Sequence, residues 1–394
     1  MHKDFNTENI TPKVTGSVRV EAVFEPSQAV ITPFLEHPRQ LPILNTRLED
    51  HQHRVMDILN IPIVSTESQD KNKGRLVLKD TVFCTKELLK IFLEESQRIG
   101  KPTQCAVKKG ALTERTITST MDVDDLGDSI GYRVNYYPPG SDQYDAIKPL
   151  VIDSDDYIQE ITFPEHMVPG RVYKVPITRK IIVQIEHWSN LWACNIAALL
   201  GNIADLKSDK LKQLLLAFRA LSTNQWRVSS KNVQIGKGCD IHPTAYIENS
   251  VIGDGVEVGA YSVIRGSIIK DRSMIQNNCT VAYSVLGEEC NLKDGVNLTY
   301  SMLFPGAVTT CSFLNTSVMG RDSFFPVGSV LTDYRFDGRC VTVMKDGKVM
   351  DSGQIFLGSC LGHNSYVGAG IIVAPGREIP NGVRLLPNHN VITK

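Results

Sequence analysis

The chain has 394 residues with 42 basic and 43 acidic side chains, which gives a formal net charge of −1 at pH 7. Its length allows two domains, and the balanced charge provides no attractive field for nucleic acid or an anionic membrane, so neither is expected as a partner. The nine cysteines form no CxxC pair, which favours a reduced, cytoplasmic protein without a disulfide framework or a zinc site. No long apolar run occurs, so a membrane span is not expected.

Strand-like and helix-like patterns alternate over residues 1–228 and predict an α/β domain. Residues 18–24 alternate apolar and polar side chains as a strand does, and residues 48–59 carry the apolar pattern of a helix. Residues 75–80 predict a second strand, and residues 85–95 predict a second helix.

The last part of this domain is richer in helical patterns. Trp188 and Trp192 are four residues apart and flank an apolar run, which indicates core packing. Residues 208–221 have the apolar spacing of an amphipathic helix that leads out of the domain, and we expect its apolar face to pack on the first domain.

The order of elements near the start is similar to that of the sugar-1-phosphate nucleotidyltransferases, with Leu-Pro-Ile-Leu-Asn at residues 41–45 and a strand that ends in Asp80. The resemblance implies an abbreviated domain of that fold, in which Asp80 holds Mg²⁺ together with substrate phosphates. That family also has a glycine-rich phosphate loop, whereas this chain has no glycine between Gly16 and Gly74. Asp80 is therefore either a metal ligand or a residue that caps the turn before Thr81.

A different period begins near residue 235, where aliphatic residues recur in steps of six, six and five. Serines follow the same repeat at 17-residue intervals. Neither a helix nor a flat strand has this period, so the pattern predicts short strands that coil around a triangular prism and stack their aliphatic side chains inside it. The expected inward residues are Ile235, Ile241, Ile247, Ile252, Val258, Ile264, Ile269, Ile275, Val281, Leu286, Leu292, Leu298 and Leu303.

Residues 229–394 resemble the hexapeptide-repeat proteins, and this resemblance implies a left-handed parallel β-helix. The period stops at residues 333–354, which we interpret as an inserted arm. Asp346-Gly347 between valine-rich segments predicts a two-residue hairpin turn in this arm.

The coil, arm and second coil also resemble the acetyltransferase half of bifunctional sugar-1-phosphate nucleotidyltransferase/acetyltransferases. The resemblance implies a homotrimer in which the arm reaches a neighbouring subunit and acetyl-CoA, or a related acyl-CoA, lies in the groove between prisms. It places the family's tyrosine at Phe313, its asparagine at Asp333 and its basic histidine at Thr310, and threonine cannot act as a base. His363, in the first coil after the arm, is therefore the candidate base. The expected CoA-binding residues are Gly368, Ala369, Gly370 and Arg377.

Three functions remain open from the sequence. The first is acyl transfer from CoA to an amino sugar or nucleotide sugar, with His363 as the base. The second is nucleotidyl transfer to a sugar 1-phosphate at Asp80. The third is a non-catalytic subunit, descended from such enzymes, that binds a ligand or regulates. In each case the expected small-molecule partner is a sugar phosphate or a nucleotide sugar.

Overall fold

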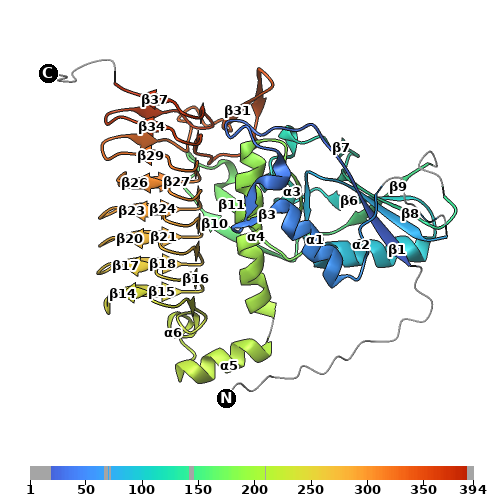
Figure 1. Ribbon diagram of the computed structural model, residues 1–394, viewed down its shortest axis with the longest axis horizontal. Helices are drawn as coiled ribbons and strands as arrows, with labels where there is room; N and C mark the ends of the chain where they lie inside the picture. Colours follow the sequence, from blue (N-terminus) through green and yellow to red (C-terminus); the bar gives the residue numbers. More distant parts are fainter. Residues whose placement is uncertain (1–18, 66–69, 71, 142–145, 209, 388–394) are drawn as a thin grey trace.

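A computed structural model describes residues 19–65, 70, 72–141, 146–208 and 210–387. An α/β part lies beside a prism of stacked coils, and the long helix α4 (Trp188–Ser208) runs between them (Figure 1). No helix within the described residues is both long and apolar enough to cross a membrane.

The α/β part is built on a mixed sheet with the strand order β1-β4-β8-β6-β9, and β7 pairs with β8. Its strands are β1 (Val20–Glu25), β4 (Gly74–Lys79), β6 (Thr103–Lys108), β7 (Asp124–Asp125), β8 (Ser129–Tyr137) and β9 (Lys148–Ile152). Three two-stranded sheets accompany it: β2 (Pro42–Ile43) with β3 (Thr46–Arg47), β5 (Val82–Cys84) with β12 (Ile182–Gln184), and β10 (Tyr157–Thr162) with β11 (Val172–Ile177). The two strands predicted near residues 18–24 and 75–80 are therefore confirmed as β1 and β4, which pair in parallel.

The other helices of this part and of the linker are α1 (Leu48–Ile58), α2 (Lys86–Ile99), α3 (Ala111–Arg115), α5 (Lys210–Ala220) and α6 (Gln225–Ser229). Both predicted N-terminal helices are confirmed as α1 and α2. Helix α2 buries one apolar stripe and ends at Gly100, whose φ of 64° suits the left-handed cap that glycine adopts readily. Trp188 is fully buried and Trp192 is 6% exposed, so the predicted core role of both is also confirmed.

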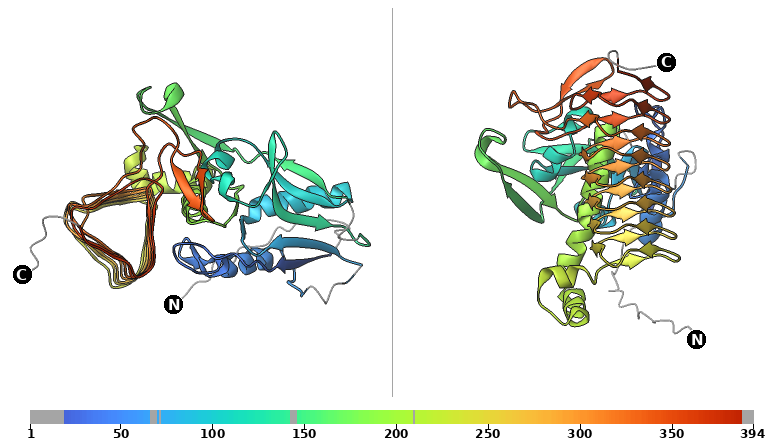
Figure 2. Two further views of the ribbon diagram at one scale, coloured as in Figure 1. Left: turned by 90° about the horizontal axis from the view of Figure 1, so that it is seen from above. Right: turned by 90° about the vertical axis from the view of Figure 1, so that its left-hand side faces the viewer.

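The C-terminal part is a triangular prism, and its successive short strands pass from one face to the next (Figure 2). The first face contains β13 (Gln234–Ile235), β16 (Val251–Ile252), β19 (Ile268–Ile269), β22 (Val285–Leu286), β25 (Met302–Leu303), β28 (Val318–Met319), β33 (Cys360–Leu361) and β36 (Glu378–Ile379). The second face contains β14 (Asp240–Ile241), β17 (Glu257–Val258), β20 (Met274–Ile275), β23 (Asn291–Leu292), β26 (Val308–Thr309), β29 (Phe324–Phe325), β34 (Tyr366–Val367) and β37 (Arg384–Leu385). The third face contains β15 (Tyr246–Glu248), β18 (Val263–Arg265), β21 (Thr280–Ala282), β24 (Asn297–Thr299) and β27 (Phe313–Asn315), followed by the pair β30 (Val330–Leu331) and β35 (Ile372–Val373).

The predicted aliphatic column fills the prism. Residues one coil apart are parallel strand partners, as Ile264 and Val281 are, and the column is buried from Ile252 onward. Ile241 and Ile247 pack partly buried against it, whereas Ile235 in the first coil is 53% exposed. Ile235 is thus the exception, because no coil below it covers its side chain.

The serines that recur every 17 residues form a second column, which is linked by hydrogen bonds. The hydroxyl of Ser284 donates to the carbonyl of Ala282 at 2.9 Å and accepts from the backbone N–H of Ser301 at 3.1 Å. Ser267 and Ser301 make the same pair of contacts with their own neighbours. Each buried hydroxyl therefore links its coil to the next one, which explains the 17-residue spacing.

The first face of the prism packs on the α/β part. Met302, Val318 and Cys360 point outward from this face and belong to the same apolar core as α4, whereas Leu303 and Met319 point inward. At one edge of the face, Trp192 Nε1 on α4 donates to the carbonyl of Tyr300 at 2.7 Å. At the other edge, Asn45 Nδ2 donates to the carbonyl of Leu286 at 2.8 Å, so the α/β part spans the whole first face.

The arm contains the hairpin β31 (Thr342–Lys345) and β32 (Lys348–Asp351). Asp346 and Gly347 have φ values of 50° and 74°, so the predicted two-residue turn is confirmed. The resemblance implied an arm that reaches a neighbouring subunit. Instead, Val343 is buried in the core of the α/β part of the same chain, and Lys345 Nζ donates to the carbonyl of Thr120 at 2.6 Å.

Helix α5 corrects one expectation about packing. Its predicted apolar stripe exists, but only Leu216 is buried, at 4% exposure. The other apolar side chains face solvent, with Leu211 at 77%, Leu214 at 68%, Leu215 at 57% and Phe218 at 73% exposure. The expectation that this face packs on the first domain is therefore wrong, and the helix lies below the α/β part in Figure 1.

Candidate functional site

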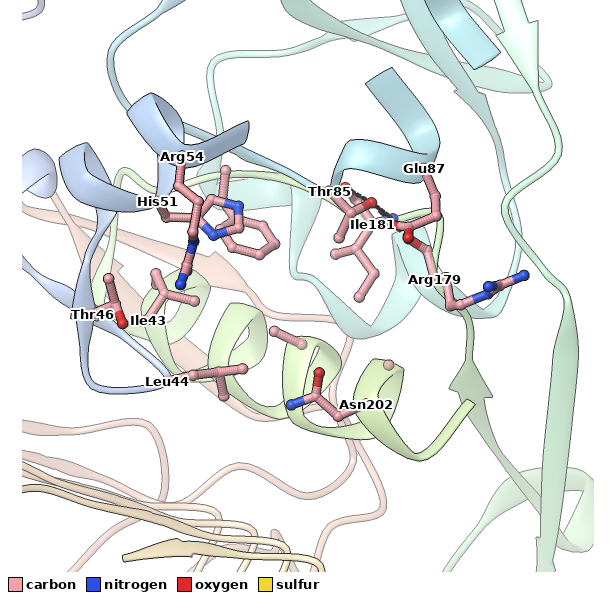
Figure 3. Close-up of a pocket in the computed structure, with 13 residues that line it drawn as sticks. Ile43, Leu44, Thr46, His51, Arg54, Thr85, Glu87, Arg179, Ile181 and Asn202 are labelled. Atoms are coloured by element: carbon pink, nitrogen blue, oxygen red, sulfur yellow. Dashed lines mark hydrogen bonds between the residues drawn. The ribbon is translucent and has the colours of Figure 1, made fainter. Parts of the chain in front are cut away.

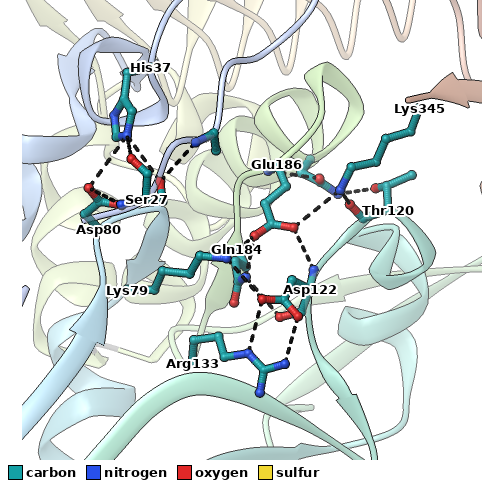
Figure 4. Close-up of polar contacts among 12 residues, drawn as sticks. Ser27, His37, Lys79, Asp80, Thr120, Asp122, Arg133, Gln184, Glu186 and Lys345 are labelled. Atoms are coloured by element: carbon teal, nitrogen blue, oxygen red, sulfur yellow. Dashed lines mark hydrogen bonds and ion pairs between the residues drawn. The ribbon is translucent and has the colours of Figure 1, made fainter. Parts of the chain in front are cut away.

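Asp80, the predicted metal ligand, follows β4 and is buried (Figure 4). The backbone N–H of Ser27 lies 3.1 Å from each of its carboxylate oxygens, and His37 Nε2 lies 3.6 Å from Oδ2. These contacts hold the segment after β1 against the end of β4. The carboxylate is thus used inside the chain, but on the segment around Ser27 and not on the turn before Thr81.

The acidic side chains near Asp80 are paired with cations (Figure 4). Lys79 Nζ lies 3.1 Å from Asp122 Oδ2 and 2.8 Å from Glu186 Oε1, and Lys345 Nζ lies 3.4 Å from Glu186 Oε2. Hydrogen bonds from Arg133, assisted by Lys79, lower the pKa of Asp122 to about 2. Among the described residues, no group of three or more His, Cys, Asp or Glu side chains is placed to hold a metal ion. Asp80 therefore lacks the neighbouring ligands that the Mg²⁺ expectation required.

His363 lies at the edge between the first and second faces, and it is 5% exposed. Its ring centroid lies 4.9 Å from that of Phe34 and 5.1 Å from that of Phe304. The sequence placed His363 on a groove between subunits, but the structure places its ring under Phe34 of the same chain. This is a correction of its location.

The contacts of the two ring nitrogens of His363 determine whether it can act as a base. Nδ1 accepts the backbone N–H of Arg321 at 2.8 Å, so Nε2 carries the proton and lies 3.3 Å from Glu36 Oε1. Hydrogen bonding to His363 is the largest cause that lowers the pKa of Glu36. In this arrangement neither ring nitrogen offers a free lone pair, which a general base requires.

The residues expected to bind CoA do not lie together. Gly368, Ala369 and Gly370 form the corner between the second and third faces, where Gly370 has a φ of 84°. Arg377 lies at the next corner, between the third and first faces, and its Nη2 donates to Thr342 Oγ1 of the arm at 3.0 Å.

Asp333, the second candidate catalytic residue, follows β30 at the corner between the third and first faces. Asn315 Nδ2 donates to its Oδ2 at 2.6 Å, and burial raises the pKa of Asp333 despite this hydrogen bond. His363 and Asp333 thus lie at opposite edges of the first face and do not form one site.

Asp333 lines a cavity of about 350 Å³ between the prism, the arm and the α/β part, which we call the arm cavity. Its lining contains Arg115, Phe163, Tyr173, Trp192, Tyr300, Phe313, Asn315, Asp333, Tyr334 and Phe356, together with smaller apolar side chains. Apart from Asp333 and the carried-over position Phe313, sequence reasoning missed these residues. Each aromatic residue stands alone in its own segment, so no spacing signal marks them.

A second cavity, of about 340 Å³, lies between α1, α2 and α4 (Figure 3). His51 stacks on Phe83 with ring centroids 4.3 Å apart, and its Nε2 lies 3.0 Å from the carbonyl oxygen of Cys84. Burial lowers the pKa of His51, so the ring is neutral and Nε2 donates to that carbonyl. Arg54 and Arg179 also line this cavity, and Glu87 is its single acidic lining residue.

Comparison with known proteins places residues 220–324 in one family model, described as the left-handed β-helix domain of EIF2B subunit epsilon. No curated protein matches the chain. The C-terminal part is a left-handed β-helix of hexapeptide repeats, as the resemblance implied. No match supports the nucleotidyltransferase half of that resemblance.

Solved structures with similarity to this chain include transferases. The acetyltransferase domain of PglB from Neisseria gonorrhoeae is 20% identical over 44% of this chain and 62% of that chain, with a TM-score of 0.20. A GDP-perosamine N-acetyl transferase variant from Caulobacter crescentus, in complex with CoA and GDP-perosamine, is 20% identical over 38% and 52%, with a TM-score of 0.13. A hexapeptide transferase family protein from Anaplasma phagocytophilum is 15% identical over 39% and 78%, with a TM-score of 0.18.

Proposed function

We propose that this chain is a non-catalytic subunit of a larger assembly of the EIF2B type. The observation that carries this proposal is that the candidate base His363 and the candidate metal ligand Asp80 are both already engaged by groups of the same chain. His363 is covered by Phe34 and hydrogen-bonded at Nδ1, and Asp80 is held by Ser27. Neither side chain is available to a substrate in this arrangement.

The position of the prism supports the same proposal. In the acyltransferases that the chain resembles, the groove between neighbouring prisms holds the acyl donor. Here the first face packs on α4, and the arm packs on the α/β part rather than extending to another molecule. The residues expected to bind CoA, Gly368, Ala369, Gly370 and Arg377, are divided between two corners of the prism.

Two further observations support a role as a subunit. The matching family model describes a domain of a subunit, and it matches residues 220–324. Helix α5 exposes four large apolar side chains between Leu211 and Phe218. Exposed apolar clusters of this kind mark surfaces that a partner covers.

The test is co-expression of the full chain with the EIF2B subunits of its own organism. We expect the chain to co-elute with them in a stoichiometric complex by size-exclusion chromatography with light scattering. The same preparations are assayed for free thiol release from acetyl-CoA with amino-sugar acceptors, and for pyrophosphate release with sugar phosphates and nucleoside triphosphates. We expect rates no higher than those without protein. Failure to co-elute, or turnover that His363→Ala abolishes, would overturn the proposal.

Acyl transfer is the second candidate function, and the Asp333–Asn315 pair favours it. This pair lies beside a cavity at a prism corner, and burial raises the pKa of Asp333. Such a shift is common for groups that take part in proton transfer. If this candidate is correct, thiol release from acetyl-CoA will be detectable and will be lost in Asp333→Asn.

A further inference from the structure

We propose that the arm cavity is a binding site for a small organic cation, of the ammonium class, whose charge pairs with Asp333. The site would serve a subunit or an enzyme equally, so it is independent of the proposed function. The inference depends on the charge balance, the aromatic walls and the size of the cavity.

Asp333 is a partly buried acid without a cationic partner among the described residues. Among the described residues it makes no ion pair, and its hydrogen bonds come from uncharged groups, the amide of Asn315 and its own backbone N–H. Loss of solvent is the main cause that raises the pKa of Asp333, and the hydrogen bonds from Asn315 and from its own backbone N–H oppose that effect only in part. A carboxylate that has lost part of its solvent and has no counter-charge is unfavourable, and a bound cation would reduce that penalty.

Arg115 is the one basic residue in the lining, and its guanidinium is engaged elsewhere. Nε donates to the carbonyl of Lys174 at 2.9 Å, and Nη1 donates to Gln354 Oε1 at 3.0 Å. The guanidinium carbon lies 3.9 Å from the ring centroid of Tyr173. Arg115 therefore holds Tyr173 in place and also shows that this aromatic wall accepts a cation on a ring face.

The aromatic rings form a connected wall. Phe356 has its ring centroid 5.2 Å from Phe163, 5.5 Å from Tyr173 and 5.6 Å from Tyr334. These rings come from the β10–β11 region and from both ends of the arm. Aromatic faces attract cations through the ring quadrupole, and enclosures of several rings are a recurrent way to bind ammonium groups.

The volume restricts the ligand to a small molecule. At about 350 Å³ the cavity lies near the lower end of the range for ligand pockets. Phe313 lines the cavity and is 51% exposed, so the cavity approaches the surface beside this residue. A compact ammonium compound therefore fits the chemistry and the space better than a nucleotide.

The test compares choline with 3,3-dimethylbutan-1-ol, its neutral isostere, on the full chain by saturation-transfer NMR and titration calorimetry. We expect choline to bind saturably and at least about tenfold more tightly than the isostere, which corresponds to about 1.4 kcal/mol. Asp333→Asn keeps the shape of the side chain and is expected to abolish this preference. Asp337→Asn, in the arm but outside the cavity lining, is expected to leave it unchanged.

Three outcomes would overturn the proposal. These are the absence of saturable choline binding, equal affinity for choline and its isostere, and unchanged choline affinity in Asp333→Asn. Thermal unfolding of both variants establishes that they are folded. None of these outcomes bears on whether the chain joins an assembly, because that test measures co-elution.

Discussion

At the scale of single residues, the serine column explains a pattern that the sequence contains. A buried hydroxyl at Ser284 satisfies two backbone groups, one in its own coil and one in the next. An aliphatic residue at this position would fill the space but would leave the N–H of Ser301 without its partner, and the carbonyl of Ala282 with the N–H of Tyr300 as its donor. The hydroxyl is therefore required for hydrogen bonding, not for packing alone.

We expect Ser284→Ala to lower the free energy of unfolding by about 1–3 kcal/mol, because the buried N–H of Ser301 loses its partner. Urea unfolding followed by circular dichroism measures the change. Ser312→Ala, at an exposed position on the same prism, is the matched control and should change stability by less than about 0.5 kcal/mol. Equal effects of the two substitutions would contradict the role of the column.

Asp333 has the opposite energetic character, since its burial disfavours the charged form. A raised folded-state pKa means that this group favours folding below its unfolded pKa of about 3.9, and that this contribution is lost as pH rises through the folded value. We therefore expect Asp333→Asn to raise the melting temperature near pH 7 and to have little effect at about pH 3. Melting curves at the two pH values measure the difference, and a destabilised variant at pH 7 would contradict it.

At the scale of elements, periodicity predicts well the structures whose contacts are local or regularly repeated. The coils, the helices α1 and α2 and the hairpin turn of the arm all follow from spacings within one segment. Helix α5 shows the limit of such patterns, because its spacing predicts an apolar face but not what lies against it. Among the described side chains of that helix, only Leu216 is buried.

For α5 we expect the double variant Leu214→Glu and Phe218→Glu to change the stability of the isolated chain by no more than about 0.5 kcal/mol, because both side chains are exposed. In the co-expression experiment the same variant should co-elute less well, because the apolar surface is lost. Leu216→Glu is the contrasting control and should destabilise the chain itself, since it buries a charge. A large loss of stability in the double variant would show that α5 packs on its own chain.

At the scale of the whole molecule, the first face of the prism decides which candidate residues are accessible. Phe34 contacts two residues that are far from it in the sequence. Its ring centroid lies 4.8 Å from that of Phe304 and 4.9 Å from that of His363. No spacing within either segment predicts such contacts. For this reason the sequence could identify His363 and Asp333 as unusual residues but could not place one under the α/β part and the other in the arm cavity.

Phe34 should therefore contribute more to the free energy of unfolding than its position in a short loop would indicate. It is 2% exposed, and we expect Phe34→Ala to reduce the free energy of unfolding by about 3–5 kcal/mol. Leu35→Ala, at the neighbouring residue with 67% exposure, is the matched control and should change the free energy of unfolding by less than about 0.5 kcal/mol.

Hydrogen exchange then locates the effect within the molecule. In Phe34→Ala, exchange should accelerate around Phe304 and His363. The inner column at Ile264 and Val281 should keep its protection, because those residues do not depend on the α/β part for their packing. Uniform acceleration along the prism, or equal effects of the two variants, would show that this contact does not hold the two parts together.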